Sequence, residues 1–263
     1  MTQGRAIFCE STLPIKCGGA PQKIVFLSDD RWRKNKTRDS IEMVFRKAAN
    51  VYFPVPRYAV ELEKFHKAKN IAAHLNSNII EINKKDRVAI FQNPATKELA
   101  TEKFDLLHVV PPQSTHDFIK KSPLVNKDNC YVDVDTFSLQ HKKYKNVWAL
   151  GDNANLPTSK TAAAVMSQGP ILVRNLMRVY NKHESEFEKY DGYTSCPIFT
   201  GDNKLMLAEF KYNNEVDETF FNNQNVPRRS FFYLKKWVFP LVYFHLMPRG
   251  YWLGKKGFGT ALL

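Results

Sequence analysis

The sequence predicts an α/β fold built around a parallel sheet. Residues 57–69 (RYAVELEKFHKAK) space their apolar side chains near 3.6 residues, which indicates an amphipathic helix between predicted strands at 41–46 and 79–82. The apolar run Leu106–Val110 ends at Pro111-Pro112, as expected for a buried strand. A strand, a helix and a buried strand in this order predict a nucleotide-binding unit of the Rossmann type.

The remaining predicted elements add an insertion and a long helix. Residues 87–92 (RVAIFQ) form a predicted strand, which the turn Asn93-Pro94 and an antiparallel return at 101–104 extend into a β-meander. Gly169-Pro170 is expected to kink the long helix, because proline lacks a backbone donor. The second half of the chain contains predicted strands at Tyr131–Val134, Asn146–Leu150 and 204–210, and the helix from Thr161 to about Tyr180.

Composition and charge limit the function classes. The chain has 263 residues, enough for one large domain or two ordinary ones, and 13% aromatic residues exclude disorder for most of it. The 39 Lys and Arg against 26 Asp and Glu give a net charge of +13, which favours anionic partners: nucleic acid, anionic lipid or a phosphorylated cofactor. Composition shifts predict domain boundaries near residues 142 and 227.

The stretch 228–263 is basic and aromatic, with seven Lys and Arg and no acidic residue. Its charge-free part, 237–248, contains Pro240 and is shorter than a membrane-spanning helix. Such a segment suits a membrane interface, although a helix pair packed on the core, or stacking on single-stranded nucleic acid, has the same composition. Residues 1–20 lack the apolar run of a signal peptide.

The segment Lys16–Lys23 (KCGGAPQK) places a cysteine near a predicted helix start. Pro21 is favourable in a first helical turn, and two glycines allow a close backbone approach. With Lys16 and Lys23 on either side, Cys17 is expected to have a lowered pKa and to be nucleophilic. The alternative is a buried structural thiol, which is where most free cysteines lie.

A second motif follows the predicted strand Asn146–Leu150. Gly151-Asp152 at its end would place a carboxylate at the carboxyl edge of a sheet, where it can hold a ribose or ribityl hydroxyl. The next helix begins near Lys160 and Thr161, and Ala162 leaves its first turn uncrowded, so that its N–H groups can stabilise an anion such as a reduced flavin. The alternative is an ordinary strand, loop and capped helix.

A third motif is 190–197 (YDGYTSCP), which contains Cys196. Sequence alone does not pair Cys196 with Cys17, and Cys9 and Cys130 have no local signal beyond packing. No CxxC, HxxxH or HExxH spacing occurs, so a metal site is not expected. GxSxG, P-loop and GxGxxG patterns are absent as well, which leaves hydrolase and NTPase functions without a motif.

Taken together, the three motifs resemble those of mitochondrial-type sulfide:quinone oxidoreductases. Residues 16–23 are similar to the family's first redox-cysteine motif, 151–164 to its flavin motif and 189–197 to its second redox-cysteine motif. The tail sequence 249–252 (RGYW) is similar to its membrane segment, so the resemblance extends over nearly the whole chain.

The resemblance implies an FAD/NAD(P)-binding, disulfide-reductase-like Rossmann-type fold. Residues 1–142 would be a second nucleotide-binding-like α/β domain, 143–227 the C-terminal part of the FAD-binding domain, and 228–263 membrane-associating helices. The family's first half, which carries GxGxxG and holds the ADP part of FAD, would be absent. Asn153 stands where relatives can have cysteine. The implied location is the mitochondrial inner membrane, as a peripheral protein.

The resemblance also implies an oxidoreductase mechanism. Cys17 and Cys196 would form a redox bridge, with or without an additional sulfur, through which FAD oxidises hydrogen sulfide and reduces ubiquinone. Sulfide would attack Cys196, whose persulfide passes its sulfane sulfur to glutathione or sulfite. Nucleic acid is not an expected partner. The implied FAD-binding residues are Asp152, Lys160, Thr161 and Ala162, with Lys23 stabilising charge on Cys17 or on the reduced ring.

Two alternatives remain open at this stage. One is a catalytically incompetent, membrane-associated relative that keeps the site residues but does not hold FAD. The other is a different FAD-dependent quinone reductase, such as the NADH-dependent kind, although hydride transfer from a nicotinamide needs no pair of thiols.

Overall fold

The computed structural model describes residues 1–220 and 223–257. Its contacts divide the chain into two compact units, described separately below. These units do not coincide with the boundaries expected near residues 142 and 227, which remain a prediction about domain organisation. The first unit comprises Met1–Gln113, Ile198–Met206 and Asn225–Arg229, and the second comprises Ser114–Pro197, Leu207–Gln224 and Ser230–Leu263.

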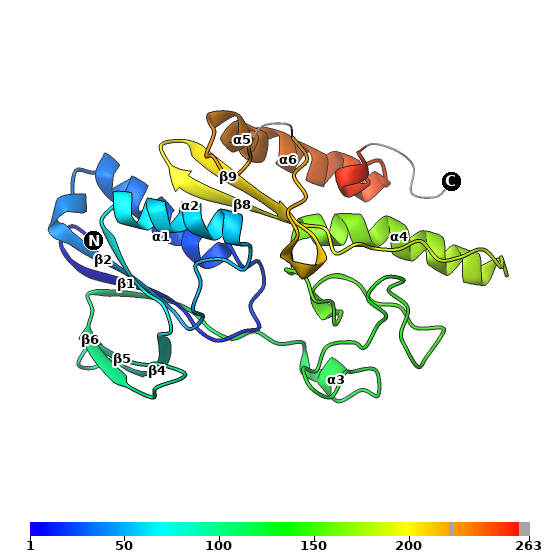
Figure 1. Cartoon of the computed structure of the whole chain (residues 1–263), viewed down its shortest axis with the longest axis horizontal. Helices are drawn as coiled ribbons and strands as arrows, with labels where there is room; N and C mark the ends of the chain where they lie inside the picture. Colours follow the sequence, from blue (N-terminus) through cyan, green and yellow to red (C-terminus); the bar gives the residue numbers. More distant parts are fainter. Residues whose placement is uncertain (221–222, 258–263) are drawn as a thin grey trace. The chain divides into compact units, whose positions relative to one another are not determined.

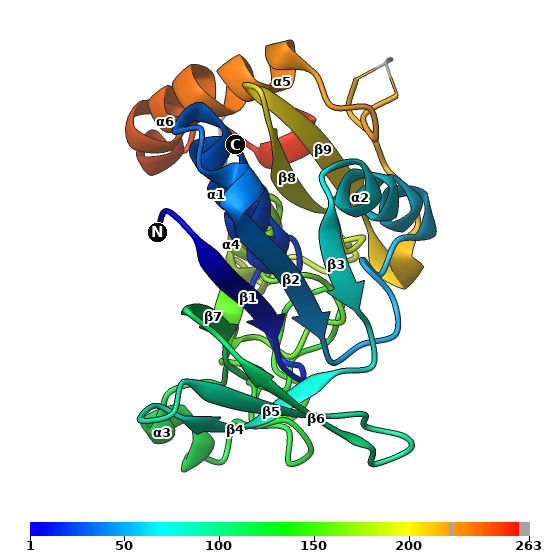
Figure 2. The same ribbon diagram turned by 90° about the vertical axis from the view of Figure 1, so that its left-hand side faces the viewer.

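A parallel four-stranded sheet forms the centre of the first unit, with strand order β3-β2-β1-β7. Ala6 in the first strand is paired with Met43 on one side and with Leu106 on the other. The first two strands are buried almost throughout, which explains their apolar sequences. Figure 2 shows the four strands side by side. Their bounds are β1 Gly4–Glu10, β2 Ile41–Lys47, β3 Ile71–His74 and β7 Leu106–Val110.

Two helices cover one face of this sheet: α1 (Ala20–Lys34) and α2 (Pro56–Ala68) (Figure 1). Each has proline in its first turn. Backbone N–H groups in this turn have no acceptor within the helix, so proline, which lacks an N–H group, removes no hydrogen bond there. Helix α2 matches the predicted amphipathic helix to within one residue at each end. It buries Tyr58, Leu62 and His66, which recur at helical spacing.

The other face of the sheet is covered by the predicted β-meander. Its antiparallel strands lie in the order β4-β5-β6, and Ala89 and Phe91 from β5 pack against Ile7 and Val44 of the parallel sheet. This arrangement confirms an α/β unit with a hairpin insertion. The bounds are β4 Asn78–Asn83, β5 Val88–Gln92 and β6 Leu99–Lys103.

The second unit contains one long helix and much irregular chain. Helix α4 (Ala162–Tyr180) begins at Thr161, whose hydroxyl accepts a hydrogen bond from the N–H of Ala164. Pro170 lies inside α4, which continues through it to Tyr180. The short helix α3 (Asp117–Lys120) precedes the irregular segment, and Ile171 of α4 packs in a core with Val132, Leu139, Leu156 and Tyr190.

The strands predicted at Tyr131–Val134 and Asn146–Leu150 are wrong. Both segments form only isolated bridges: Val132 with Val125 and Ala154, Val134 with His141, and Trp148 with Gln140. Apolar composition favours extended chain, but a strand also needs a neighbour that offers successive backbone partners. Here Val132 and Val134 pack into the core around α4 instead.

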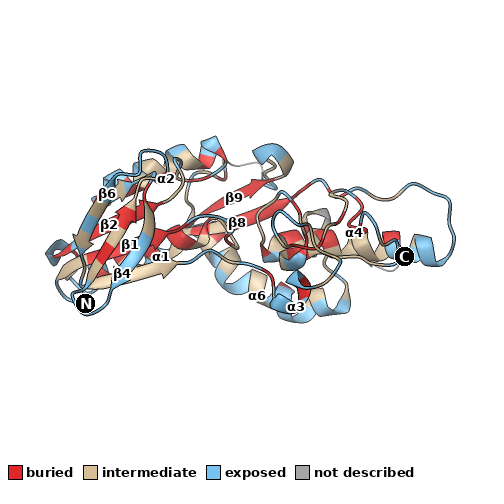
Figure 3. Ribbon diagram, turned by 90° about the horizontal axis from the view of Figure 1, so that it is seen from below, coloured by how far each residue is buried: buried red, intermediate tan, exposed pale blue. Residues whose placement is uncertain are grey.

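A two-stranded hairpin links the two units along the chain: β8 (Thr194–Gly201) and β9 (Lys204–Phe210). Only β9 was predicted, because β8 contains Thr, Ser and Pro as well as apolar residues. Every residue of both strands except Lys204 is buried or half-buried (Figure 3). The hairpin tip belongs to the first unit and its base to the second.

The basic and aromatic tail is helical from Arg229 to Arg249, with two short segments of π type. No helix within residues 1–220 and 223–257 has the length and apolar character needed to cross a bilayer. The tail's last aromatic residue, Phe258, lies outside the described residues. The α-helical parts of this run are α5 (Arg229–Tyr233) and α6 (Phe239–Leu241).

Candidate functional site

Cys17 lies in a tight turn between β1 and α1, with a left-handed backbone (φ 59°). Its carbonyl accepts a hydrogen bond of 2.8 Å from the N–H of Ala20, which opens α1. One turn into the helix, Lys23 donates a hydrogen bond from Nζ to the Cys17 Sγ over 3.3 Å. An ammonium group at this distance favours a thiolate over a thiol, which supports the nucleophilic role expected for Cys17.

A buried ion pair lies at the carboxyl ends of the two strands next to this turn. Lys47, the last residue of β2, donates a hydrogen bond to Glu10, the last residue of β1. The side chains are 5% and 3% exposed, and burial raises the pKa of Glu10 against the opposing effect of Lys47. Sequence analysis missed this pair, although opposite charges at the ends of two neighbouring strands, Glu10 in β1 and Lys47 in β2, were a usable signal.

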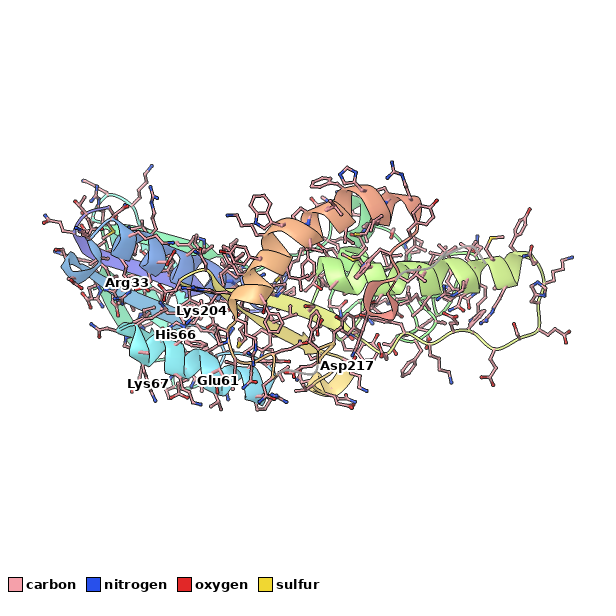
Figure 4. The ribbon with its side chains drawn as sticks, turned by 90° about the horizontal axis from the view of Figure 1, so that it is seen from above. Arg33, Glu61, His66, Lys67, Lys204 and Asp217 are labelled. Carbon is pink, nitrogen blue, oxygen red and sulfur yellow. The ribbon has the colours of Figure 1, made fainter. Side chains whose placement is uncertain are left out.

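A histidine is buried between the sheet and its two helices. The Nε2 of His66 lies 3.2 Å from Oε1 of Gln22, whose Nε2 donates to the carbonyl of Tyr52. Gln22 therefore presents its oxygen to His66, and the imidazole carries its proton on Nε2. Burial among aromatic rings lowers the pKa of His66 to about 3. The next residue, Lys67, lies on the exposed side of α2 (Figure 4).

In the second unit, Gly151 and Asp152 lie in a short 3₁₀ turn, held by α4. The N–H of Gly151 donates a 2.7 Å hydrogen bond to Oε1 of the buried Gln168. Gly151 has φ 68°, and a Cβ atom there would lie 3.0 Å from Cγ2 of Val165. Only glycine fits this turn without strain. The predicted position of Asp152 thus depends on Gln168 and Val165, and not on a strand.

Asp152 and Lys160 both lie near Tyr131. The ammonium of Lys160 sits 4.2 Å from the centre of the Tyr131 ring and donates a 2.6 Å hydrogen bond to the carbonyl of Ala154. Burial, and then the Asp152 carboxylate, raise the pKa of Tyr131. Two half-buried side chains of opposite charge, Asp152 and Lys160, thus lie near the buried Tyr131 ring, and sequence analysis had not included the tyrosine.

Cys196 is fully buried on β8, beside the N-terminus of α4. The hydroxyl of Ser159 lies 3.8 Å from its Sγ. Two residues earlier on the strand, the Thr194 hydroxyl contacts the Thr161 hydroxyl at 2.8 Å and donates to the carbonyl of Ser159 at 3.0 Å. The segment before α4 is therefore held against β8 next to the sulfur.

The residues of the second unit fit the flavin end of FAD by the chemistry of their donor set. Asp152 is half-buried and offers a carboxylate acceptor for a hydroxyl of the cofactor. The first N–H groups of a helix have no intrahelical acceptor, and the small side chains of Ala162 and Ala163 leave those of α4 uncrowded. Lys160 has its ammonium on Ala154 and Tyr131, so its expected role at the ring remains a prediction.

The structure thus gathers five expected site residues in the second unit: Asp152, Lys160, Thr161, Ala162 and Cys196. Cys17 and Lys23 belong to the first unit. The pairing of the two cysteines therefore stays a prediction. Within the described parts of the chain, no group of three or more His, Cys, Asp or Glu side chains is placed to hold a metal ion.

Comparison with known proteins shows which proteins this chain is similar to over most of its length. Over 95% of its length the chain is 46% identical to the mitochondrial sulfide:quinone oxidoreductase of Dictyostelium discoideum. It is 41% identical over 97% of its length to the enzyme of the same name from Schizosaccharomyces pombe. The chain is a relative of the mitochondrial sulfide:quinone oxidoreductases. It spans 55% and 57% of these two relatives. No family model matches the chain.

The fold of this chain is similar to that of solved oxidoreductase structures. The sulfide:quinone oxidoreductase of Aquifex aeolicus superimposes with a TM-score of 0.79 at 12% identity, over 93% of this chain and 59% of that one. A flavoprotein disulfide reductase of Escherichia coli gives 0.50 at 13% identity, over 81% of this chain and 43% of that one. The fold is thus that of the disulfide-reductase-like flavoproteins, as the resemblance implied.

Proposed function

We propose that this chain carries both redox thiols and the flavin-end half-site of a sulfide:quinone oxidoreductase, and that it oxidises hydrogen sulfide with ubiquinone as electron acceptor. The observation that supports this most is the contact of Lys23 with Cys17, because a thiol pair works only if one sulfur is available as a thiolate. The relatives' names add the mitochondrion as the location.

The proposed sulfur chemistry starts from a disulfide between Cys17 and Cys196. Hydrosulfide attacks the Cys196 sulfur, the bond between the two cysteines breaks, and Cys196 becomes a persulfide while Cys17 leaves as a thiolate. Lys23 holds the negative charge of that thiolate. Glutathione or sulfite then removes the outer sulfur from Cys196, which leaves a thiol. Re-forming the disulfide releases two electrons.

FAD, when bound, would take up these two electrons and pass them to ubiquinone. Asp152 would accept a hydrogen bond from a ribityl hydroxyl, and Gln168 keeps the Gly151 turn in place for it. The N-terminus of α4 would lie at the electron-rich edge of the ring, where its dipole favours negative charge.

The tail would hold the quinone side of the protein at a membrane surface. Trp237, Leu241 and Phe244 are 64%, 57% and 68% exposed, and their spacing places them along one side of the helical run. Lys235 and Lys236 lie next to them, so an apolar stripe flanked by cations is available for anionic lipid. We propose peripheral attachment to the mitochondrial inner membrane by this stripe.

Sulfide-dependent reduction of a short-chain ubiquinone by the FAD-loaded chain tests the proposed function. Cys17→Ser and Cys196→Ser should each abolish the reaction, whereas Cys130→Ser should leave it unchanged. Full activity in either of the first two variants would contradict the assigned roles. A chain that stays colourless after addition of FAD would instead favour the alternative, a membrane-associated relative without catalytic activity.

A further inference from the structure

The environment of Cys196 poses a physical problem for the proposed reaction. The residue is 0% exposed, so a negative charge on its sulfur has little contact with water. A buried charge is costly unless a hydrogen-bond donor or an opposite charge offsets the lost hydration. One side-chain group within hydrogen-bonding distance of this sulfur is the hydroxyl of Ser159, at 3.8 Å.

The backbone of Ser159 is fixed by a directed series of hydrogen bonds. The N–H of Ala164 donates to the Thr161 hydroxyl, which leaves that oxygen's own proton for Thr194, 2.8 Å away. Thr194 in turn donates to the carbonyl of Ser159. Every proton in this series has one acceptor, so the order of donors is determined.

This series ties together the two segments that determine the position of Ser159. Thr161 is the N-cap of α4, and Thr194 lies two residues before Cys196 on the same strand, hence on the same face. Thr194 is 0% and Thr161 9% exposed, so water does not compete strongly for these bonds. A shift of Ser159 relative to Cys196 would break a buried hydrogen bond, which is unfavourable.

We propose that Ser159 is a positioning residue for the Cys196 sulfur: its hydroxyl donates a hydrogen bond to the thiolate and holds it in the orientation required for sulfur transfer. The role of Ser159 in sulfide oxidation rests on the proposed function. The hydrogen bond from Ser159 to the Cys196 thiolate does not depend on that function. When Cys196 carries a proton, the same serine oxygen accepts the weak S–H donor, so Ser159 serves both protonation states.

The experiment measures the thiolate directly. The whole chain, reduced and labelled with ¹³C at the cysteine Cβ atoms, is titrated by NMR without flavin, sulfide or quinone. The Cys196 signal is assigned by its loss in Cys196→Ser. We expect Ser159→Ala to move the Cys196 titration midpoint upward by about 0.5 to 1 pH unit, which corresponds to one lost hydrogen bond.

Three comparisons make the result specific. Ser159→Thr keeps a hydroxyl and should restore the midpoint. Ser195→Ala removes a hydroxyl next to Cys196 on the opposite face of β8, and it should leave the midpoint unchanged. All variants should keep the wild-type circular dichroism spectrum, which excludes a change of fold as the cause of a shift.

Several outcomes would overturn the proposal: an unchanged Cys196 midpoint in Ser159→Ala, an equal shift in Ser195→Ala, or a wild-type Cys196 signal that does not titrate below pH 10. Because no cofactor or substrate is present, these outcomes are distinct from a failure of the proposed oxidoreductase activity.

Discussion

Lys23 places its ammonium group 3.3 Å from the Sγ of Cys17, one helical turn after the cysteine's own tight turn. The contact joins the Cys17 turn to the first turn of α1. Because Pro21 and the two glycines favour a helix start at this point, the side chain of Lys23 lies next to that of Cys17. The motif therefore provides a sulfur and its counter-charge within a single local structure.

Removal of that counter-charge should slow the reaction of Cys17 with iodoacetamide. We expect Lys23→Met to lower the rate at pH 7 by about fivefold, equivalent to about 1 kcal/mol of lost thiolate stabilisation at a partly exposed site. Quantitative mass spectrometry of the Cys17 peptide measures this rate. Lys64→Met removes the same charge from a remote pair with Glu61 and is the control. Equal rates in both variants would argue against the contact.

Acid should destabilise the first unit through His66. Its pKa is about 3 in the folded state against 6.5 ordinarily, so the unfolded chain binds more protons between these values. The contribution of the neutral His66 to the free energy of unfolding is then fully present above pH 6.5. It decreases as the pH falls, by up to about 1.4 kcal/mol per pH unit. Urea unfolding at pH 6.5 and 5 should show this loss in the wild type and a smaller one in His66→Leu. Parallel pH dependences would exclude the histidine as the cause.

Asp29 should be among the most sensitive charged positions of α1. It is 0% exposed and accepts hydrogen bonds from Arg38, Lys69 and Arg33 at 2.8 to 3.0 Å. Burial alone would raise its pKa, but these three cations together lower it. Asp29→Asn leaves Arg38 buried without its counter-charge, and we expect a loss of about 3 to 5 kcal/mol in the free energy of unfolding.

The matched control for Asp29→Asn is Glu61→Gln, which breaks an ion pair on the surface of α2 (Figure 4). Its expected loss is below about 1 kcal/mol, because water screens the exposed Lys64. Denaturant titrations of both variants give the comparison. Similar losses at the two positions would show that burial of Asp29 is not the decisive factor.

Gly151→Ala should strain the turn before Asp152. The left-handed backbone and the 3.0 Å approach to Val165 predict a loss of about 1 to 2 kcal/mol in the free energy of unfolding. Val165→Ala removes the approaching methyl group, so the glycine substitution should cost less in that background. A double-mutant cycle by urea unfolding measures the coupling, and strictly additive losses would contradict the steric account.

Membrane attachment by the tail should depend on its exposed apolar stripe. Phe244→Ser removes a side chain that is 68% exposed, and we expect it to weaken binding to vesicles containing anionic phospholipid about tenfold. Sedimentation with vesicles measures the bound fraction. Phe118→Ser, which alters a side chain 73% exposed on α3, should bind as the wild type does. Equal loss in both variants would mean that the tail has no special role.

Periodicity predicted the elements of the first unit well, because their pattern is local. The spacing in α2, the alternating runs of the meander strands and the run Leu106–Val110 are local patterns, and the structure has all of these elements. The extended segments around Val132 and Trp148 show where this reasoning stops. Their apolar side chains were recognised, but whether such a segment becomes a strand depends on a partner elsewhere in the chain.

The sequence by itself determined the motifs: a cysteine with a lysine one turn later, a Gly-Asp turn, and a threonine that caps α4. The residues of each motif lie close together along the chain, so residue type and spacing are enough to recognise it. Only the tertiary structure decided which distant side chains support them: Gln168 behind Gly151, Thr194 and Ser159 beside Cys196, and Gln22 against His66. Such contacts are set by the packing of whole helices and strands. The pattern of apolar residues predicts which face of an element is buried, but not which polar side chains become partners there.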